Sequence, residues 1–268
     1  MNTDVIMEVR NLAFSYNSGR QIFSDIDFEL HKGEVFVILG ANGAGKSTLL
    51  NCMSNILSAS CGEVLLKGQA ITKYPINEVA KIIGYVPQLS APAFSYTVRD
   101  YIVMGRAPHM GILNVPGQTE YDMADQIMAE LEIGHLADKI FLNISGGERQ
   151  QVQIARVLVQ ESEIVLLDEP TNHLDYGNQL KIIHTISRLA RERELAVVLT
   201  SHMPDHAILL NGTVGILNHQ GRLTVGSAKD VISENSLKTL YNTDLHLVYI
   251  EELQRVACVA GKSEEYRK

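Results

Sequence analysis

Residues 40–48 combine three glycines, a lysine and two hydroxyl side chains at a spacing that suits a phosphate ligand. The glycines allow a tight turn in which backbone N–H groups point at phosphate oxygens. Lys46 supplies a charge for the β- and γ-phosphates, and the Ser47 hydroxyl can ligate Mg²⁺. This spacing, G-x-x-x-x-G-K-S, predicts a loop that binds a nucleoside triphosphate. The residues predicted to bind it are Gly40, Ala41, Asn42, Gly43, Ala44, Gly45, Lys46, Ser47 and Thr48.

Two adjacent carboxylates form a second chemical group, because Asp168 and Glu169 directly follow the apolar residues 164–167. Side chains alternate along an extended strand, so these two should point in different directions. Asp168 is then the candidate for holding Mg²⁺, and Glu169 is the candidate for polarising the attacking water. An apolar run ending in two acids is weak evidence alone, but it becomes strong beside the phosphate loop.

Two more polar side chains, Gln88 and His202, come at or shortly after the ends of short apolar runs. Such runs are typical of parallel strands buried on both faces, and ligands bind at the carboxyl ends of these strands. Gln88 offers an amide oxygen to Mg²⁺ or water. His202 would contact the γ-phosphate and orient the water, the alternative being a structural hydrogen bond. The predicted catalytic residues are Glu169, His202, Lys46 and Gln88, and the predicted magnesium ligands are Ser47, Gln88 and Asp168.

The surrounding elements fit these positions. Apolar residues 35–39 predict a strand before the phosphate loop, and residues from about 46 onward predict a helix behind it, whose dipole favours phosphate. Alternating apolar and acidic residues near 25–30 predict antiparallel strands at the start of the chain. Residues 97–160 read as helical. A further helix is expected over about 178–193, with Leu180, Ile183, Ile186 and Ala190 facing inward.

A third motif, Ser-Gly-Gly-Glu-Arg at residues 145–149, opens a predicted helix. Ser145 and Glu148 have the spacing of a capping box, in which each side chain bonds the other residue's backbone N–H. With the phosphate loop, Gln88, the acids, residues 170–175 and His202, this motif makes the sequence resemble the ATP-binding cassette (ABC) ATPases over residues 6–242.

The resemblance implies an α/β fold with a P-loop NTPase (RecA-like) parallel-sheet core. It further implies an N-terminal antiparallel β-subdomain and an inserted α-helical subdomain over about 97–160. It also implies a homodimer that encloses two ATP molecules with Mg²⁺, each loop facing the signature motif of the other copy. Tyr16 matches the aromatic residue that stacks on adenine, the alternative being a tyrosine packed on the core; GTP is not excluded. The residues implied to act across the dimer are Ser145, Gly146, Gly147, Glu148 and Asp175.

Residues 85–110 resemble the corresponding segment in ATPase subunits of bacterial importers for iron chelates (siderophores), haem and vitamin B12. In those subunits the segment receives the membrane permease, so Phe94–Met110 is the expected docking segment, with Phe94, Tyr96, Met104 and Met110 as flexible or apolar contacts. A periplasmic or surface solute-binding protein would be an indirect partner. Molybdate or metal-ion import, a non-transport cassette and a regulatory cassette without turnover are the alternatives.

Bulk properties narrow the function classes. A net charge of −8 argues against broad nucleic-acid binding, and the three cysteines lack metal-ligand spacing. No apolar run approaches the roughly 18 residues that span a bilayer, and no signal peptide is recognisable. We therefore expect a cytoplasmic protein, peripheral on the inner face of the membrane. Residues 243–268 are expected to form a C-terminal extension whose end is frayed. The extension either packs as a terminal strand or regulates assembly.

Overall fold

The computed structural model describes residues 4–16, 19–88, 94–111 and 113–261. Its centre is a six-stranded, mostly parallel sheet in the order β10-β9-β3-β8-β7-β6. Only β10 in this sheet runs antiparallel to its neighbour. The strands are β3 (Val35–Leu39), β6 (Ile83–Val86), β7 (Ile164–Leu167), β8 (Ala196–Ser201), β9 (Thr213–Leu217) and β10 (Leu223–Ser227).

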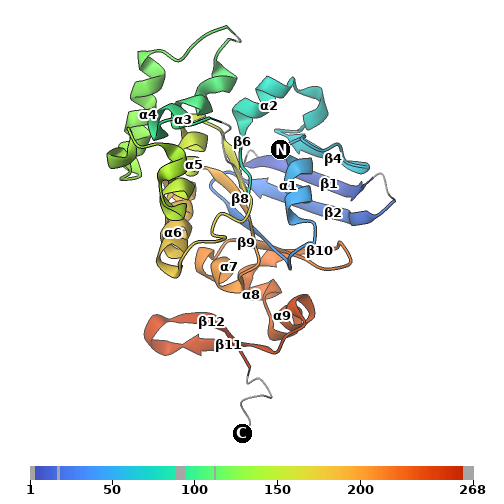
Figure 1. Cartoon of the computed structure of the whole chain (residues 1–268). Helices are drawn as coiled ribbons and strands as arrows, with labels where there is room; N and C mark the ends of the chain where they lie inside the picture. Colours follow the sequence, from blue (N-terminus) through green and yellow to red (C-terminus); the bar gives the residue numbers. More distant parts are fainter. Residues whose placement is uncertain (1–3, 17–18, 89–93, 112, 262–268) are drawn as a thin grey trace.

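A second, antiparallel sheet lies beside the first in the order β2-β1-β4-β5 (Figure 1). Along β2 the apolar residues Ile26, Phe28 and Leu30 are buried and the acids between them are not, as the alternation predicts. The expected N-terminal antiparallel β-subdomain is therefore present. Its strands are β1 (Val5–Ser15), β2 (Gln21–His31), β4 (Cys61–Leu66) and β5 (Gln69–Ala70).

The inserted helical region packs at one side of the central sheet, where α3, α4 and α5 contact one another (Figure 1). The helices are α1 (Lys46–Met53), α2 (Ile76–Ile82), α3 (Val98–Val103), α4 (Gln118–Glu130), α5 (Gly146–Val159), α6 (Tyr176–Arg193), α7 (Pro204–Leu210), α8 (Ala228–Val231) and α9 (Glu234–Tyr241). Short 3₁₀ turns cover Ile71–Lys73, Met104–His109, Gly134–Leu136, Phe141–Asn143 and Glu251–Leu253. Among the described residues, none of these helices has the length and apolarity to cross a membrane.

Strand β3 separates two hydrophobic cores. Val35, Val37 and Leu39 pack with the helical region, whereas Phe36 and Ile38 pack with the antiparallel sheet and α1. Because successive side chains of a strand point to opposite faces, one five-residue strand serves both cores. The strand that leads into the phosphate loop is therefore held from two sides.

Helix α6 differs in detail from its sequence pattern. Leu180, expected inward, is only partly buried, and Ile182 and Leu189 are buried beside the expected Ile183, Ile186 and Ala190. The buried stripe is thus wider than a strict i, i+3, i+4 pattern because this helix contacts both α5 and α7.

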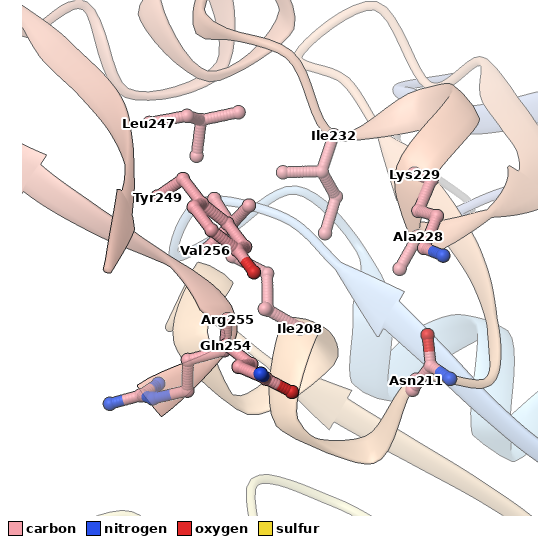
Figure 2. Close-up of a pocket in the computed structure, with 10 residues that line it drawn as sticks. All are labelled: Ile208, Asn211, Ala228, Lys229, Ile232, Leu247, Tyr249, Gln254, Arg255 and Val256. Atoms are coloured by element: carbon pink, nitrogen blue, oxygen red, sulfur yellow. The ribbon is translucent and has the colours of Figure 1, made fainter. Parts of the chain in front are cut away.

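The C-terminal extension forms a separate hairpin of β11 (Leu245–Ile250) and β12 (Arg255–Ala260), which joins neither sheet. It contacts α7 and α9, and the Cys258 N–H donates to Asp205 Oδ1 at 3.1 Å. A cavity of about 740 Å³ lies between this hairpin, the end of α7 and α8. Figure 2 shows the side chains that line it. The final residues 262–268, expected to be frayed, lie outside the described part of the chain.

Candidate functional site

The phosphate loop connects the end of β3 to the start of α1, the strand-to-helix context that the motif requires. Gly45 is the N-cap of α1 with φ 103°, and a Cβ there would lie 2.5 Å from Ile22 Cγ2. Both the left-handed backbone and the lack of space therefore require glycine. Since glycine has no side chain to cap the helix, the first-turn N–H groups of α1 receive no side-chain cap and stay available to a ligand.

Lys46 lies across the loop and is almost fully buried. Its Nζ donates to the carbonyl oxygens of Gly40 at 2.9 Å and Ala41 at 3.1 Å, and lies 3.0 Å from Glu169 Oε1. An ammonium group has three donors, and three oxygens take them here. A phosphate that binds Lys46 must therefore displace at least one of these oxygens.

The two adjacent acids diverge, as predicted, but for a different reason than strand alternation. β7 ends at Leu167, and Glu169 has φ 47°, which places it in the left-handed region. Asp168 turns into the protein and accepts a hydrogen bond from Thr200 Oγ1 at 2.7 Å, whereas Glu169 faces Lys46. The left-handed turn costs about 1 kcal/mol for a non-glycine residue, so other contacts must hold it.

Polar groups surround the Glu169 carboxylate. Its Oε2 accepts from Gln88 Nε2 at 3.3 Å and Asn172 Nδ2 at 3.1 Å, and lies 3.4 Å from His202 Nδ1. The His202 ring contributes most to lowering the pKa of Glu169 to about 2, with Lys46 adding to this lowering, and burial opposes it. The carboxylate is therefore ionised at neutral pH and, in this arrangement, a weak base.

Lys46, Gln88, Glu169 and Asn172 line a cavity of about 530 Å³ beside the phosphate loop, whereas His202 contacts Glu169 from outside this lining. Tyr16 lies at its mouth, 47% exposed, with its hydroxyl 3.4 Å from Thr48 Oγ1 and its ring edge-on to Phe14. The residue is thus partly exposed beside the phosphate loop, and its ring also contacts the core residue Phe14. The lining residues are Tyr16, Arg20, Ile22, Asn42, Gly43, Gly45, Lys46, Ser47, Thr48, Gln88, Glu169 and Asn172.

Oxygen donors suitable for magnesium are present at this edge. Ser47 and Gln88 line the cavity, and the Gln88 amide oxygen is left over because its nitrogen faces Glu169. Asp168 lies deeper and is 4% exposed. No group of three or more His, Cys, Asp or Glu side chains converges as a metal site within the described residues, so Mg²⁺ would draw further ligands from phosphate and water.

The signature motif forms a different kind of helix start. Ser145 is the N-cap of α5; its Oγ accepts from the Glu148 N–H at 3.3 Å, and Glu148 Oε2 accepts from the Ser145 N–H at 2.8 Å. The predicted capping box is confirmed. The Ser145 hydrogen bonds hold the pKa of Glu148 below its usual value.

The signature motif does not reach the phosphate loop of its own chain. A Cβ on Gly147 would lie 2.6 Å from Asn178, and one on Gly146 would lie 3.5 Å from Leu174, so the motif packs on the start of α6. Asp175 is the N-cap of that helix and accepts from the Asn178 N–H at 2.9 Å. None of Ser145, Gly146, Gly147, Glu148 or Asp175 lines the cavity in the described structure.

Sequence reasoning overlooked three contributors to the site: Arg20, Asn172 and Thr200. Asn172 stands three residues after Glu169 in a motif already recognised, and that short spacing is a signal for contact across a turn. Thr200 lies on β8 two residues before His202, so its place near the strand end could have been predicted. Arg20 lies in a loop and had no such signal.

The expected docking segment begins at the edge of the described structure. Phe94 is 69% exposed and stands edge-on to Tyr96, with 6.2 Å between the ring centroids. Met104 and Met110 are partly buried. The preceding residues 89–93 lie outside the described part of the chain.

Comparisons with known proteins agree with these motifs. The family model described as "ABC transporter" matches residues 23–172. The molybdate import ATP-binding protein MolC of Haemophilus influenzae is 33% identical over 88% of this chain and 88% of its own length. The iron(3+)-hydroxamate import ATP-binding protein FhuC of Bacillus subtilis is 29% identical over 94% of each. A solved ABC transporter assigned to the metal-chelate type, in an inward-facing conformation, matches with TM-score 0.85 and 30% identity, covering 97% of this chain and 98% of that one.

Proposed function

This chain belongs to the ABC transporter family, and we propose that it powers import of an iron chelate (siderophore) or related metal complex through a separate permease. Members of the family are ATPases, and the chain is an ABC ATPase that uses ATP with Mg²⁺. The observation that carries the proposed chemistry is the 3.0 Å contact between Lys46 and Glu169 inside the phosphate-loop cavity. It joins the predicted phosphate-binding and base groups in one place.

In the proposed reaction, Lys46 leaves Glu169 to bind the β- and γ-phosphates. Glu169 then accepts a proton from a water that attacks the γ-phosphorus, and the bond to the β-phosphate oxygen breaks to give ADP and phosphate. Losing the ammonium contact raises the proton affinity of the carboxylate, because Lys46 is one cause of its low pKa. Substrate binding thereby makes the base stronger. His202 and Gln88, which already face this carboxylate, orient the water.

We further propose a homodimer closed by ATP. Ser145, Gly146, Gly147 and Glu148, with Asp175, lie outside the cavity of their own chain, which supports a role toward the nucleotide of a second copy. ATP would favour the closed dimer only through contacts that the open form lacks. Hydrolysis removes those contacts and reopens it.

The membrane permease would dock on residues 94–110, where Phe94 projects into solvent. In this proposal the ATPase would lie on the inner face of the membrane, with a solute-binding protein acting on the far side. A charged substitution at Met104 is expected to reduce transport while leaving the basal ATPase rate of the isolated chain near wild type.

Molybdate import is the second candidate, because one relative at 33% identity carries that name. The cargo is decided by uptake in cells from which the gene has been deleted. Loss of labelled ferric-hydroxamate uptake, restored by the wild-type gene but not by E169Q, supports the proposal. Normal ferric-chelate uptake with loss of molybdate uptake would contradict it.

A further inference from the structure

Thr200 is a fully buried residue of β8 whose hydroxyl touches both acidic residues of the site. We infer that Thr200 is a positioning residue, which fixes Asp168 and Glu169 in the relative orientation that hydrolysis of Mg-ATP needs. The inference rests on the roles proposed above for those two acids. Thr200 does not line the cavity, yet this inference gives it a part in the reaction.

The hydrogen bonds of Thr200 can be directed in one way only. Its Oγ1 lies 2.8 Å from the Glu169 backbone nitrogen and 2.7 Å from Asp168 Oδ1. The backbone N–H can only donate, so the hydroxyl accepts there, and its single proton is donated to Asp168 Oδ1. One oxygen atom therefore couples the backbone of the proposed base to the side chain of the proposed metal-binding acid.

This contact sits at the point where the two acids separate. The last pair between β7 and β8 is Leu167 with Leu199, so the next residues are Asp168, directly after β7, and Thr200 in β8. Glu169 follows in the left-handed conformation, with φ 47°, which is uncommon for a residue with a side chain. The Thr200 bond to its N–H holds the turn that aims Glu169 at Lys46 and His202.

Removing the hydroxyl should disturb both acids together. The partly buried Glu169 N–H and the Asp168 Oδ1 atom would each lose this partner, and each can replace it only by moving. The phosphate loop itself has no bond to Thr200 among the described contacts, so binding of ATP without metal should persist. A positioning role predicts that only the response to Mg²⁺ and the turnover rate are impaired. A merely structural role predicts that metal-free ATP binding and thermal stability are impaired as well.

The test compares Thr200→Val, which keeps the shape, with Thr200→Ser, which keeps the hydroxyl. Thr213→Val is the matched control, because Thr213 donates to Glu34 at the opposite ends of the sheet strands. For each full-length variant we would measure kcat and KM, the Mg²⁺ concentration at half-maximal rate, nucleotide affinity with and without Mg²⁺, and the thermal midpoint.

For T200V we expect kcat to fall between about tenfold and 100-fold, the range that a small misplacement of reacting groups produces. Nucleotide affinity should weaken in Mg²⁺ but change less than about twofold in EDTA. T200S and T213V should stay within about threefold of wild type in kcat. Wild-type kcat in folded T200V, or equal impairment of T200S and T200V, would overturn the inference.

If T200V does not fold, Thr200→Cys replaces it, since a thiol is only a weak hydrogen-bond donor. A kcat lowered as expected for T200V would support the inference, and a wild-type kcat would overturn it. E169Q is assayed in parallel to separate the two levels of the argument. Full turnover in E169Q would defeat the proposed role of Glu169. Lost turnover in E169Q beside normal kcat in T200V would defeat only the inference about Thr200.

Discussion

Two helices of this protein begin at glycine-rich turns, yet they begin in opposite ways. α1 starts behind Gly45, which offers no side chain to its first turn, whereas α5 starts behind Ser145 with a complete capping box. Each start also has one nearby glutamate. Glu169 near α1 is 9% exposed and contacts four other side chains across the site, and Glu148 at α5 is 31% exposed and bonds to its own cap.

The difference separates a helix start whose first-turn donors have no side-chain partner from one in which the chain itself satisfies two donors. At α1 the first-turn N–H groups have no side-chain acceptor and can bind phosphate. The Glu169 carboxylate contacts the Lys46 ammonium group, for which a bound phosphate would compete. At α5 the protein's own serine and glutamate satisfy two donors. The same substitution, Glu to Gln, should therefore have very different effects at the two places.

The largest effect is expected for Glu169→Gln. An amide cannot accept the proton of the attacking water, so the ATPase rate should fall by about 10²–10⁴-fold. ATP binding should persist, and gel filtration with Mg-ATP should show a dimer that wild type forms only transiently. A variant that stays monomeric with bound ATP would contradict the dimer, and one that hydrolyses normally would contradict the base.

Alanine scanning of the loop glycines comes next. Gly45→Ala would place a Cβ 2.5 Å from Ile22, whereas a Cβ on Gly43, also at positive φ, meets no atom within 4 Å. We expect Gly45→Ala to weaken ATP binding at least about tenfold, which is about 1.4 kcal/mol. Gly43→Ala should lower the free energy of unfolding by about 1 kcal/mol, because alanine is strained at positive φ, and should weaken ATP binding less than Gly45→Ala does. Equal losses from both variants in a nucleotide titration would show that the packing against Ile22 is unimportant.

Acid titration gives a smaller effect. The pKa of Glu169 is depressed from 4.5 to about 2, so its ionised form stabilises the fold above pH 4.5 and this stability is lost as pH falls toward 2. The difference in unfolding free energy between wild type and E169Q should therefore narrow by about 2 kcal/mol between pH 6 and pH 3. Denaturant titrations at the two pH values measure it. A difference independent of pH would mean that Lys46 and His202 do not hold the carboxylate ionised.

The smallest effect is expected for Glu148→Gln. Glutamine also completes a capping box, so only the charge at the helix start is lost, about 0.3–1 kcal/mol. The ATPase rate should remain within severalfold of wild type. A hundredfold loss would show that this carboxylate takes part in the chemistry, and the contrast with Glu169 would disappear.

Much of the site was predictable because its residues follow local rules. The phosphate loop, the capping box of Ser145 and Glu148, and the strand before Asp168 each depend on a few neighbouring residues. The divergence of Asp168 and Glu169 was predicted from alternation along the strand, but the strand ends before both residues and a left-handed turn at Glu169 produces it. Such a turn has no signal in the side-chain pattern.

Contacts between distant segments were harder to foresee. The bonds from Thr200 to both acids join segments 31 and 32 positions apart, and they exist because β7 and β8 are neighbours in the sheet. Leu180 was placed inward by periodicity, but packing of α6 against two other helices shifted the buried stripe. The C-terminal hairpin exists because β11 pairs with β12. A short apolar run in the sequence does not show which segment a strand will pair with.

The division of β3 between two cores has a consequence for how the protein denatures. If either the antiparallel layer or the helical layer unfolded alone, β3 would lose the side-chain contacts on one of its faces. The antiparallel layer and the helical layer should consequently unfold in a single cooperative transition, despite their different architecture. Amide hydrogens of Phe36, Val37 and Ile38 should then be among the slowest to exchange with deuterated solvent, marking the rigid root from which the loop extends.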